Sequence, residues 1–172
     1  AVKRLRRYLK RRKRLVYRFK WQEADMIDIY SDTDWAGCLR TRKSTSGGCV
    51  VLGQSHAIKT WSSTQQSISL SSGEAEYYGM VKAGSVGLGM KSMMEDLGIT
   101  KKLRVMTDSS AAKGIASRRG LGTTRYIEVN QLWIQDKVAQ GEIELVKVPG
   151  NANVADALAK AVESSELQWH ME

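Results

Sequence analysis

The sequence predicts a single α/β domain in which a five-stranded mixed sheet is flanked by helices. Three strand-like segments come first, at 27–32, 49–53 and 57–61, and two later ones, at 103–107 and 143–148, alternate with helical segments. Strands joined by short turns favour antiparallel pairing, whereas strands separated by helices favour parallel pairing. A chain of 172 residues that is 42% hydrophobic is long enough for one domain with a real core.

The first three strands are predicted from composition and short connections. Residues 27–32 alternate and are rich in β-branched and aromatic types, which is typical of a strand. A polar connection over 36–47 follows. The second and third strands are separated only by Gln54-Ser55-His56, and this short spacing favours an antiparallel meander.

A long helix is predicted to begin at Ser71 or Ser72 and to run towards Leu97-Gly98. A capping hydroxyl followed by Glu74 and Glu76 is typical of a helix start, and Gly98 is typical of a helix stop. Each interior glycine costs about 1 kcal/mol of helix propensity relative to Ala. Close packing against the sheet would explain the four of them, Gly79, Gly84, Gly87 and Gly89.

The rest of the chain supplies the parallel strands and their helices. After the strand at 103–107 we expect a short helix at 109–118, a glycine-rich loop around Gly120 and Gly122, and a longer helix at about 124–139. The last strand, 143–148, is followed by a closing helix at 152–162. Strand and helix therefore alternate through the second half of the chain.

The positive charge is concentrated in the first twenty residues. Residues 1–20 hold eleven Lys or Arg and no acid; with 27 basic and 18 acidic residues in the whole chain, residues 21–172 carry 16 against 18, a net of −2. Such a run attracts phosphate backbones through counterion release, without reading sequence. The helical spacing of Val2, Leu5, Tyr8 and Leu9 indicates a short basic helix, and a disordered tail stays open as the alternative.

Composition also excludes several classes of protein. Cys38 and Cys49 give neither a disulfide framework nor a metal-binding spacing, and they fit a reducing compartment. No apolar run approaches the roughly 20 residues that span a bilayer, and no secretory signal is visible. We therefore expect no membrane partner and no secretion. Because the chain begins at Ala1 without an initiator Met, we also expect it to be a piece of something longer.

Four carboxylates lie far apart in the chain, in local settings that would direct them to one point. Asp32 and Asp108 come at the ends of predicted strands, and Glu76 and Asp156 lie near the starts of predicted helices. Acidic groups gathered in this way repel one another unless a divalent cation neutralises them, so the set predicts a metal site. Oxygen ligands favour Mg²⁺ or Mn²⁺, and the chain lacks the His/Cys set expected for zinc.

Asp34 is the alternative to Asp32 at the first position of this set. It would share a face with Asp32 if the strand continued for two more residues. We prefer Asp32, because Trp35-Ala36-Gly37 indicates that the chain is already turning. Asp34 is then expected to be a loop residue or a neighbour of the site.

Seven short stretches follow one another in a recognisable order: Tyr30–Gly37, Ser44–Gly47, Ser71–Tyr78, Thr107–Ala112, Ile127–Val129, Gly141–Glu144 and Val154–Asp156. In this order they resemble the ribonuclease H domain of copia-type retrotransposon polyproteins, from about Tyr30 to Lys160. Residues 1–10 look like the end of the reverse transcriptase region that precedes this domain. We therefore divide the chain into a basic segment, 1–24, which ends the reverse transcriptase or connection region, a ribonuclease H-like domain, 25–162, and a C-terminal tail, 163–172.

The resemblance implies a ribonuclease H-like fold and endonucleolytic hydrolysis of the RNA strand of an RNA–DNA hybrid during reverse transcription. The implied cofactors are two Mg²⁺ ions, for which Mn²⁺ can substitute. Asp32 would bridge both ions, and Asp156 would hold the ion that orients the attacking water. Glu76 and Asp108 would hold the ion at the leaving 3′ oxygen.

The resemblance also implies partners and a location. The partners would be the hybrid and the reverse transcriptase region of the same polyprotein, with no small-molecule cofactor. The location would be intracellular, in a cytoplasmic particle or the nucleus. The family register also ranks Glu76 over Glu74.

Further residues are candidates for nucleic-acid contact. Ser71 stands in the family position where a polar side chain meets the backbone, although a plain helix cap explains it equally well. Ser110 is placed to reach the minor groove of the hybrid, where 2′-hydroxyls are displayed. Arg40, Arg42 and Lys43 in the first loop would contact phosphate, and a solvated loop is the alternative explanation.

The chain departs from the family pattern at a few positions. Many ribonucleases H carry a His in the loop before the last Asp, whereas residues 148–153 have none, which predicts slower turnover rather than inactivity. Tyr126 stands where relatives tend to carry His, and Gly48 where they tend to carry Tyr.

The alternative function is a catalytically weak or inactive ribonuclease H-like module for nucleic-acid binding or assembly, which would use the basic segment.

Overall fold

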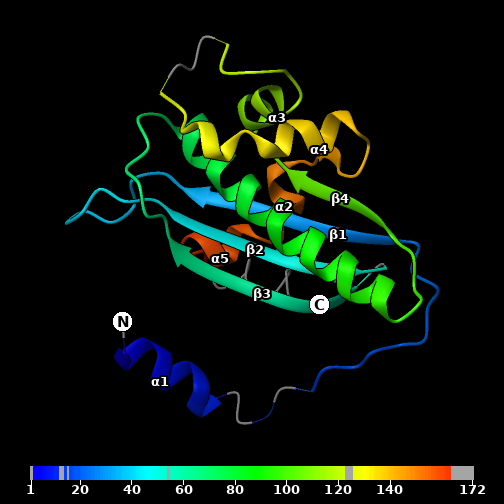
Figure 1. Cartoon of the computed structure of the whole chain (residues 1–172). Helices are drawn as coiled ribbons and strands as arrows, with labels where there is room; N and C mark the ends of the chain where they lie inside the picture. Colours follow the sequence, from blue (N-terminus) through cyan, green and yellow to red (C-terminus); the bar gives the residue numbers. More distant parts are fainter. Residues whose placement is uncertain (1, 12–13, 15, 54, 123–125, 164–172) are drawn as a thin grey trace.

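A computed structural model describes residues 2–11, 14, 16–53, 55–122 and 126–163. It contains a five-stranded sheet with the order β3-β2-β1-β4-β5 (Figure 1). The antiparallel side consists of β1 (Met26–Asp34), β2 (Thr45–Leu52) and β3 (His56–Thr64), and the parallel side adds β4 (Lys102–Thr107) and β5 (Glu144–Lys147). The predicted mixed sheet is therefore confirmed, with β1 at its centre.

Helices cover both faces of this sheet. α2 (Ser72–Asp96) crosses one face, with α3 (Ser110–Ala116) and α4 (Trp133–Ala139) on the same side, and α5 (Asp156–Ala159) packs on the opposite face (Figure 1). The core lies between α2 and the sheet, where Ile27, Ile29, Val105, Tyr77 and Met80 are fully buried. The apolar residues of β1 and β4 thus fix α2 across the sheet.

Close packing accounts for three of the four glycines inside α2. A Cβ on Gly79 would lie 2.4 Å from Thr33 Oγ1, and one on Gly87 would lie 2.7 Å from a methyl of Leu103. A Cβ on Gly84 would lie 3.1 Å from Ile134. Gly89 is exposed and a Cβ there would meet no atom within 4 Å, so packing does not explain it.

The structure corrects two predicted helices. The helix expected at 124–139 consists of a 3₁₀ turn, Val129–Gln131, followed by α4, because Glu128 has an extended backbone (φ −61°, ψ 129°); residues 123–125 lie outside the described part. The closing helix expected at 152–162 is only the 3₁₀ turn Gly150–Ala152 and the single turn α5. Asn153 between them is extended (φ −85°, ψ 95°), which prevents one continuous helix.

β2 also begins earlier than its apolar residues indicated. Residues Thr45–Gly48 pair with Asp34–Ser31, which extends the ladder over a polar stretch. Gly48 faces Trp61 on β3, and the Trp61 ring occupies the space of a side chain there: a Cβ on Gly48 would lie 2.0 Å from it. A large residue on β3 therefore compensates for the small one on β2.

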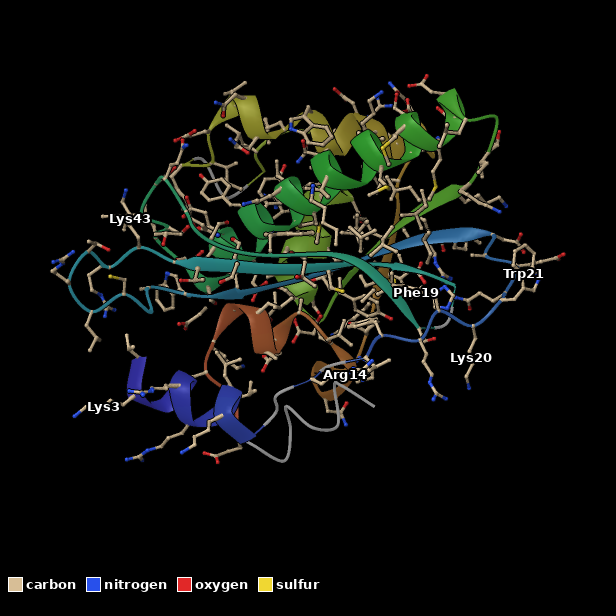
Figure 2. All side chains as sticks on the ribbon, turned by 90° about the horizontal axis from the view of Figure 1, so that it is seen from below. Lys3, Arg14, Phe19, Lys20, Trp21 and Lys43 are labelled. Atoms are coloured by element: carbon tan, nitrogen blue, oxygen red, sulfur yellow. The ribbon has the colours of Figure 1, made fainter. Side chains whose placement is uncertain are left out.

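The basic segment begins with α1 (Val2–Arg11), which Figure 1 shows apart from the sheet. Ahead of β1, Gln22 Nε2 donates to Leu52 O at the end of β2 (3.0 Å), and Phe19 lies edge-on to His56. Figure 2 shows Arg14, Phe19, Lys20 and Trp21 along this stretch. Of the helices in the described ranges, none combines the length and apolar character needed to cross a membrane.

Candidate metal centre

Three of the four predicted carboxylates meet at one end of the sheet. Asp32 lies on β1, Glu76 in the first turns of α2 and Asp108 directly after β4; each offers one oxygen, and these oxygens lie within 4.8 Å of one another. Parallel pairing of Tyr30 with Met106 brings two of them together, because Asp32 and Asp108 each lie two residues beyond that rung. The helix start then adds Glu76.

Binding of a cation or of protons at this cluster is electrostatically favourable. Burial, followed by the charges of Asp156 and Asp108, raises the pKa of Asp32 to about 6. Burial, followed by the charges of Asp32 and Asp108, raises the pKa of Glu76 to about 8. Within the described residues Glu76 Oε2 is buried and has no hydrogen-bond partner. Carboxylates in this state are stabilised by a cation that replaces the lost water.

Asp156 lies close by but is not one of the three clustered carboxylates. It is buried at the start of α5, and its Oδ1 is 2.5 Å from Lys160 Nζ, one helical turn on. Its charge is nevertheless the largest electrostatic cause of the raised pKa of Asp32. The structure therefore places all four predicted carboxylates in one neighbourhood, with the fourth held by an ammonium group.

The donor set fits a hard divalent cation. All the converging side chains are carboxylates, which are the ligands that Mg²⁺ and Mn²⁺ prefer. Glu76 belongs to this cluster, and its Oε2 is buried without a hydrogen-bond partner in the described residues. Asp32, Glu76 and Asp108 together offer three carboxylate oxygens to one such ion.

Glu74 and Asp34, which lie two residues from Glu76 and Asp32 in sequence, make other contacts. Glu74 is buried and its Oε2 accepts from Leu70 N–H (2.6 Å), while Glu74 N–H donates to Ser71 Oγ (3.2 Å). These two bonds cap α2 in the manner of a capping box. The strand expected to end at Asp32 continues to Asp34, and the turn indicated by Trp35-Ala36-Gly37 begins at Trp35. The Asp34 carboxylate lies over Gly37, where a Cβ would be 1.8 Å from its Oδ2.

The residues predicted to contact nucleic acid differ in their exposure and in their bonds. Ser71 is the N-cap of α2, and Ser110 Oγ is hydrogen-bonded to the Lys147 ammonium group. Arg40 and Arg42 are exposed, and Lys43 is half-buried, in the loop between β1 and β2. Their contact with nucleic acid stays a prediction.

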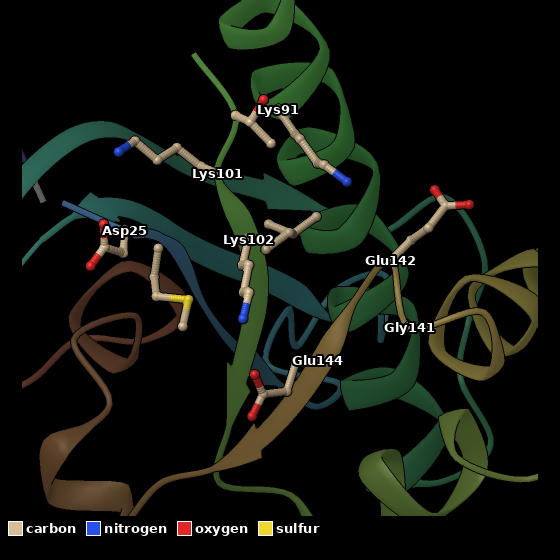
Figure 3. Close-up of a pocket in the computed structure, with 10 residues that line it drawn as sticks. Asp25, Lys91, Lys101, Lys102, Gly141, Glu142 and Glu144 are labelled. Carbon is tan, nitrogen blue, oxygen red and sulfur yellow. The ribbon is translucent and has the colours of Figure 1, made fainter.

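A cavity of about 630 Å³ lies at the other end of the sheet (Figure 3). Its lining includes Asp25, Lys102 and Glu144, which lie just before or at the starts of β1, β4 and β5. The carboxylate cluster lies at the carboxyl ends of β1 and β4, where open α/β sheets bind their ligands. None of the predicted site residues lines this cavity.

Two residues near Asp156 were not predicted to matter. Asn153 is fully buried; its Nδ2 donates to Ser31 O (3.0 Å) and its Oδ1 accepts from Ala155 N–H (3.3 Å). Gly47 lies opposite Asp32 in the ladder and leaves room for the backbone of α5. An Asn shortly before a helix start is a usual capping signal, but nothing in the sequence indicates its bond to β1.

Comparisons with known proteins agree with the resemblance of the motifs, although no family model matches the chain. It is 29% identical over 141 residues, 81% of its length, to a retrovirus-related Pol polyprotein from transposon TNT 1-94 of Nicotiana tabacum. It is also 29% identical over 171 residues, 98% of its length, to one from transposon RE1 of Arabidopsis thaliana. The chain spans only 10% and 12% of these relatives.

Solved structures show the same fold. The N-terminal RNase H domain of a Mycobacterium tuberculosis protein matches with a TM-score of 0.56 at 19% identity, covering 85% of this chain and 99% of that one. LC11-RNase H1 in complex with an RNA/DNA hybrid matches with a TM-score of 0.53 at 18% identity, covering 82% and 99%. The predicted ribonuclease H-like fold and the resemblance to retrotransposon polyproteins are thus confirmed.

Proposed function

Because the chain resembles retrotransposon Pol polyproteins in sequence and ribonucleases H in fold, we propose that it hydrolyses the RNA strand of RNA–DNA hybrids during reverse transcription. The observation that carries this proposal is the convergence of Asp32, Glu76 and Asp108 from three separate elements, with a buried Glu76 oxygen that has no partner in the described structure. Carboxylates that are desolvated and gathered in this way are costly to the folded state unless a cation neutralises them.

The four carboxylates divide between two ion positions. Glu76 and Asp108 would hold one ion and Asp156 the other, with Asp32 shared between them. When bound, two divalent ions supply positive charge at the entering and leaving oxygens of an in-line phosphodiester displacement. The chain itself orients these ligands from the rigid ends of β1 and β4 and from the capped start of α2, and the partial burial of the site keeps its electrostatic interactions strong.

Basic and hydroxyl side chains near the site would hold the hybrid. The loop between β1 and β2 offers Arg40, Arg42 and Lys43 to phosphate, and the hydroxyl groups of Ser71 and Ser110 lie at the starts of α2 and α3. A hydroxyl group can donate to or accept from the 2′-hydroxyl of RNA, which is the group that distinguishes RNA from DNA.

The loop before Asp156 would limit the rate. Residues 148–153 contain no His that could carry protons. Gly150 instead lies against the site, since a Cβ there would be 3.2 Å from Asp108 Oδ2. We therefore expect metal-dependent cleavage with slow turnover.

Cleavage of a labelled RNA–DNA hybrid by this chain, with Mg²⁺ or Mn²⁺, tests the proposal. Asp32→Asn and Asp156→Asn should each abolish cleavage, because each removes a negatively charged ligand. Asp34→Asn is the matched control, since it makes the same change two residues from Asp32 but outside the cluster. Circular dichroism confirms that all variants fold. Unchanged cleavage by Asp32→Asn would contradict the proposed site.

A second candidate function, nucleic-acid binding without cleavage, is favoured by the segment before β1. Tyr17, Phe19 and Trp21 are 59%, 60% and 94% exposed and alternate in sequence with Arg18 and Lys20. Figure 2 shows Phe19, Lys20 and Trp21 of this segment. Exposed aromatic rings next to cations are typical of surfaces on which single strands stack.

Binding of a fluorescent single strand in EDTA tests this second function separately. The apparent affinity should fall with salt, and the slope should be shallower for a variant with Arg14, Arg18 and Lys20 changed to Gln. Such binding without any cleavage of hybrid would favour the binding module over the nuclease. Equal slopes would exclude a role for these three side chains.

A further inference from the structure

Asp156 lies on a helix, α5, that is too short to be stable without contacts from other parts of the chain. α5 has only four residues, Asp156–Ala159, and its N-cap Ala155 makes no side-chain capping bond. Single helical turns are unstable unless tertiary contacts hold them. The place of the Asp156 carboxylate relative to Asp32 must therefore be set by other residues.

The side chain of Asn153 links the two backbones that carry these carboxylates. Its amide donates to the carbonyl of Ser31, the residue before Asp32, and accepts from the N–H of Ala155, the residue before Asp156. The parallel pairing of β1 with β4 ends at Tyr30, so the Ser31 carbonyl lies just beyond that ladder. Asn153 is 0% exposed, so its bonds face little competition from water.

A second contact brings α5 against the sheet at the same level. Gly47 pairs with Asp32, and a Cβ at Gly47 would lie 2.5 Å from Ala159 N and 2.8 Å from Ala155 O. Any side chain there would push the backbone of α5 away from β2. The approach of α5 to Asp32 thus depends on a glycine on one side and on the Asn153 amide on the other.

We propose that Asn153 is a positioning residue that sets the separation of Asp32 and Asp156, and thereby forms the second of the two ion positions. This inference rests on the proposed function, since it concerns the same carboxylates. Glu76 and Asp108 come from α2 and the end of β4, and neither is bonded to Asn153 in the described structure. The position formed by Asp32, Glu76 and Asp108 should therefore not depend on it.

An effect on one ion position alone distinguishes a positioning role of Asn153 from a general contribution to folding. A buried amide that only stabilised the core would, when replaced, lower the melting temperature and affect both ion positions together. A positioning amide affects one position alone. Partners that orient metal ligands typically contribute about 10- to 100-fold in metal affinity.

The test uses Mn²⁺ binding to the whole chain with Asn153→Ser. A Ser hydroxyl can still accept from Ala155 N–H, but it is too short to replace the bond to Ser31, so the local turn is kept and the link to β1 is lost. Asn151→Ser is the matched control, because Asn151 is exposed in the same loop. Calorimetric titration gives the number and affinity of bound ions, and electron paramagnetic resonance detects the magnetic coupling of two neighbouring Mn²⁺ ions.

We expect two ions in the unsubstituted chain and in Asn151→Ser. In Asn153→Ser the weaker ion should lose about 10- to 100-fold in affinity, with loss of the Mn²⁺–Mn²⁺ coupling, while the tighter ion changes by less than about twofold. Gly47→Ala displaces α5 through a different contact and should give the same selective loss, which keeps the test valid if Asn153→Ser does not fold.

Three outcomes would contradict these expectations in different ways. Two coupled ions of unchanged affinity in Asn153→Ser and Gly47→Ala would overturn this inference and leave the nuclease proposal standing. Equal weakening of both ions would also overturn it. Absence of any Mn²⁺ binding by the unsubstituted chain would overturn the proposed function, and the inference with it.

Discussion

Glu76→Gln should make the metal-free chain more stable at neutral pH, although it removes a predicted metal ligand. The pKa of Glu76 is raised to about 8 from an ordinary 4.5, first by burial and then by the charges of Asp32 and Asp108. A raised carboxyl pKa favours the protonated folded state. Its stabilising contribution is complete below pH 4.5 and is lost as the pH rises through about 8. Between these pH values the free energy of unfolding of the metal-free chain falls as the pH rises. Gln at position 76 does not ionise, so the Glu76→Gln variant lacks this contribution to the fall.

The size of the effect follows from that shift. Each pKa unit corresponds to about 1.36 kcal/mol, so at pH 7 the full shift would amount to about 3 kcal/mol in the free energy of unfolding. Glu76 is only half-buried, so solvent screening reduces the effect, and we expect a gain of about 1–3 kcal/mol for Glu76→Gln at pH 7. The gain should vanish near pH 4.

Urea denaturation in EDTA at pH 4, 6 and 8 measures this gain. Glu23→Gln is the matched control, because Glu23 is exposed in the segment before β1, and it should change stability little at any of the three pH values. Added Mg²⁺ should reverse the order at pH 8, since a ligand that binds only the folded state stabilises it. Equal or lower stability of Glu76→Gln in EDTA at pH 8 would refute the reasoning from desolvated charge.

Two further predictions concern packing and a partly buried ion pair. Gly89→Ala should raise the free energy of unfolding by up to about 1 kcal/mol through its higher helix propensity, because a Cβ there meets nothing within 4 Å. Gly79→Ala should lower the free energy of unfolding by about 1–3 kcal/mol, because its Cβ would lie 2.4 Å from Thr33 Oγ1. Urea denaturation compares the pair, and equal effects would contradict it. Arg104→Met should lower the free energy of unfolding by about 1–3 kcal/mol, because it leaves buried Asp28 without its two 2.7 Å bonds. Adding Asp28→Asn should restore part of the loss, and a cost below about 0.5 kcal/mol would contradict a role of this pair in stability.

The order of strands and helices was predictable because it depends on local patterns. Alternation in 27–32 and the short connection at 54–56 were sufficient to predict the antiparallel half of the sheet. The lengths of elements were less predictable, because they depend on tertiary contacts. β2 extends over Thr45–Gly48 only because β1 pairs with it there, and α5 ends after one turn.

Convergence of the carboxylates was predictable in part for the same reason. Strand ends and helix starts are local signals, and they brought Asp32, Glu76 and Asp108 to one point. The ion pair of Asp156 with Lys160 and the bond from Asn153 to Ser31 were not predictable. The bond joins residues 122 positions apart, which no local pattern encodes.

Gly48 and Trp61 act as one unit of packing volume, and this restricts how the sequence can change over time. The Trp61 ring fills the space where a side chain at position 48 would begin. A large aromatic residue at 48 cannot arise alone, because it would collide with that ring. It requires an earlier or simultaneous reduction at 61, so the two positions are epistatic. Sequences of this fold with Tyr at the equivalent of 48 should therefore carry a smaller or differently oriented residue opposite it.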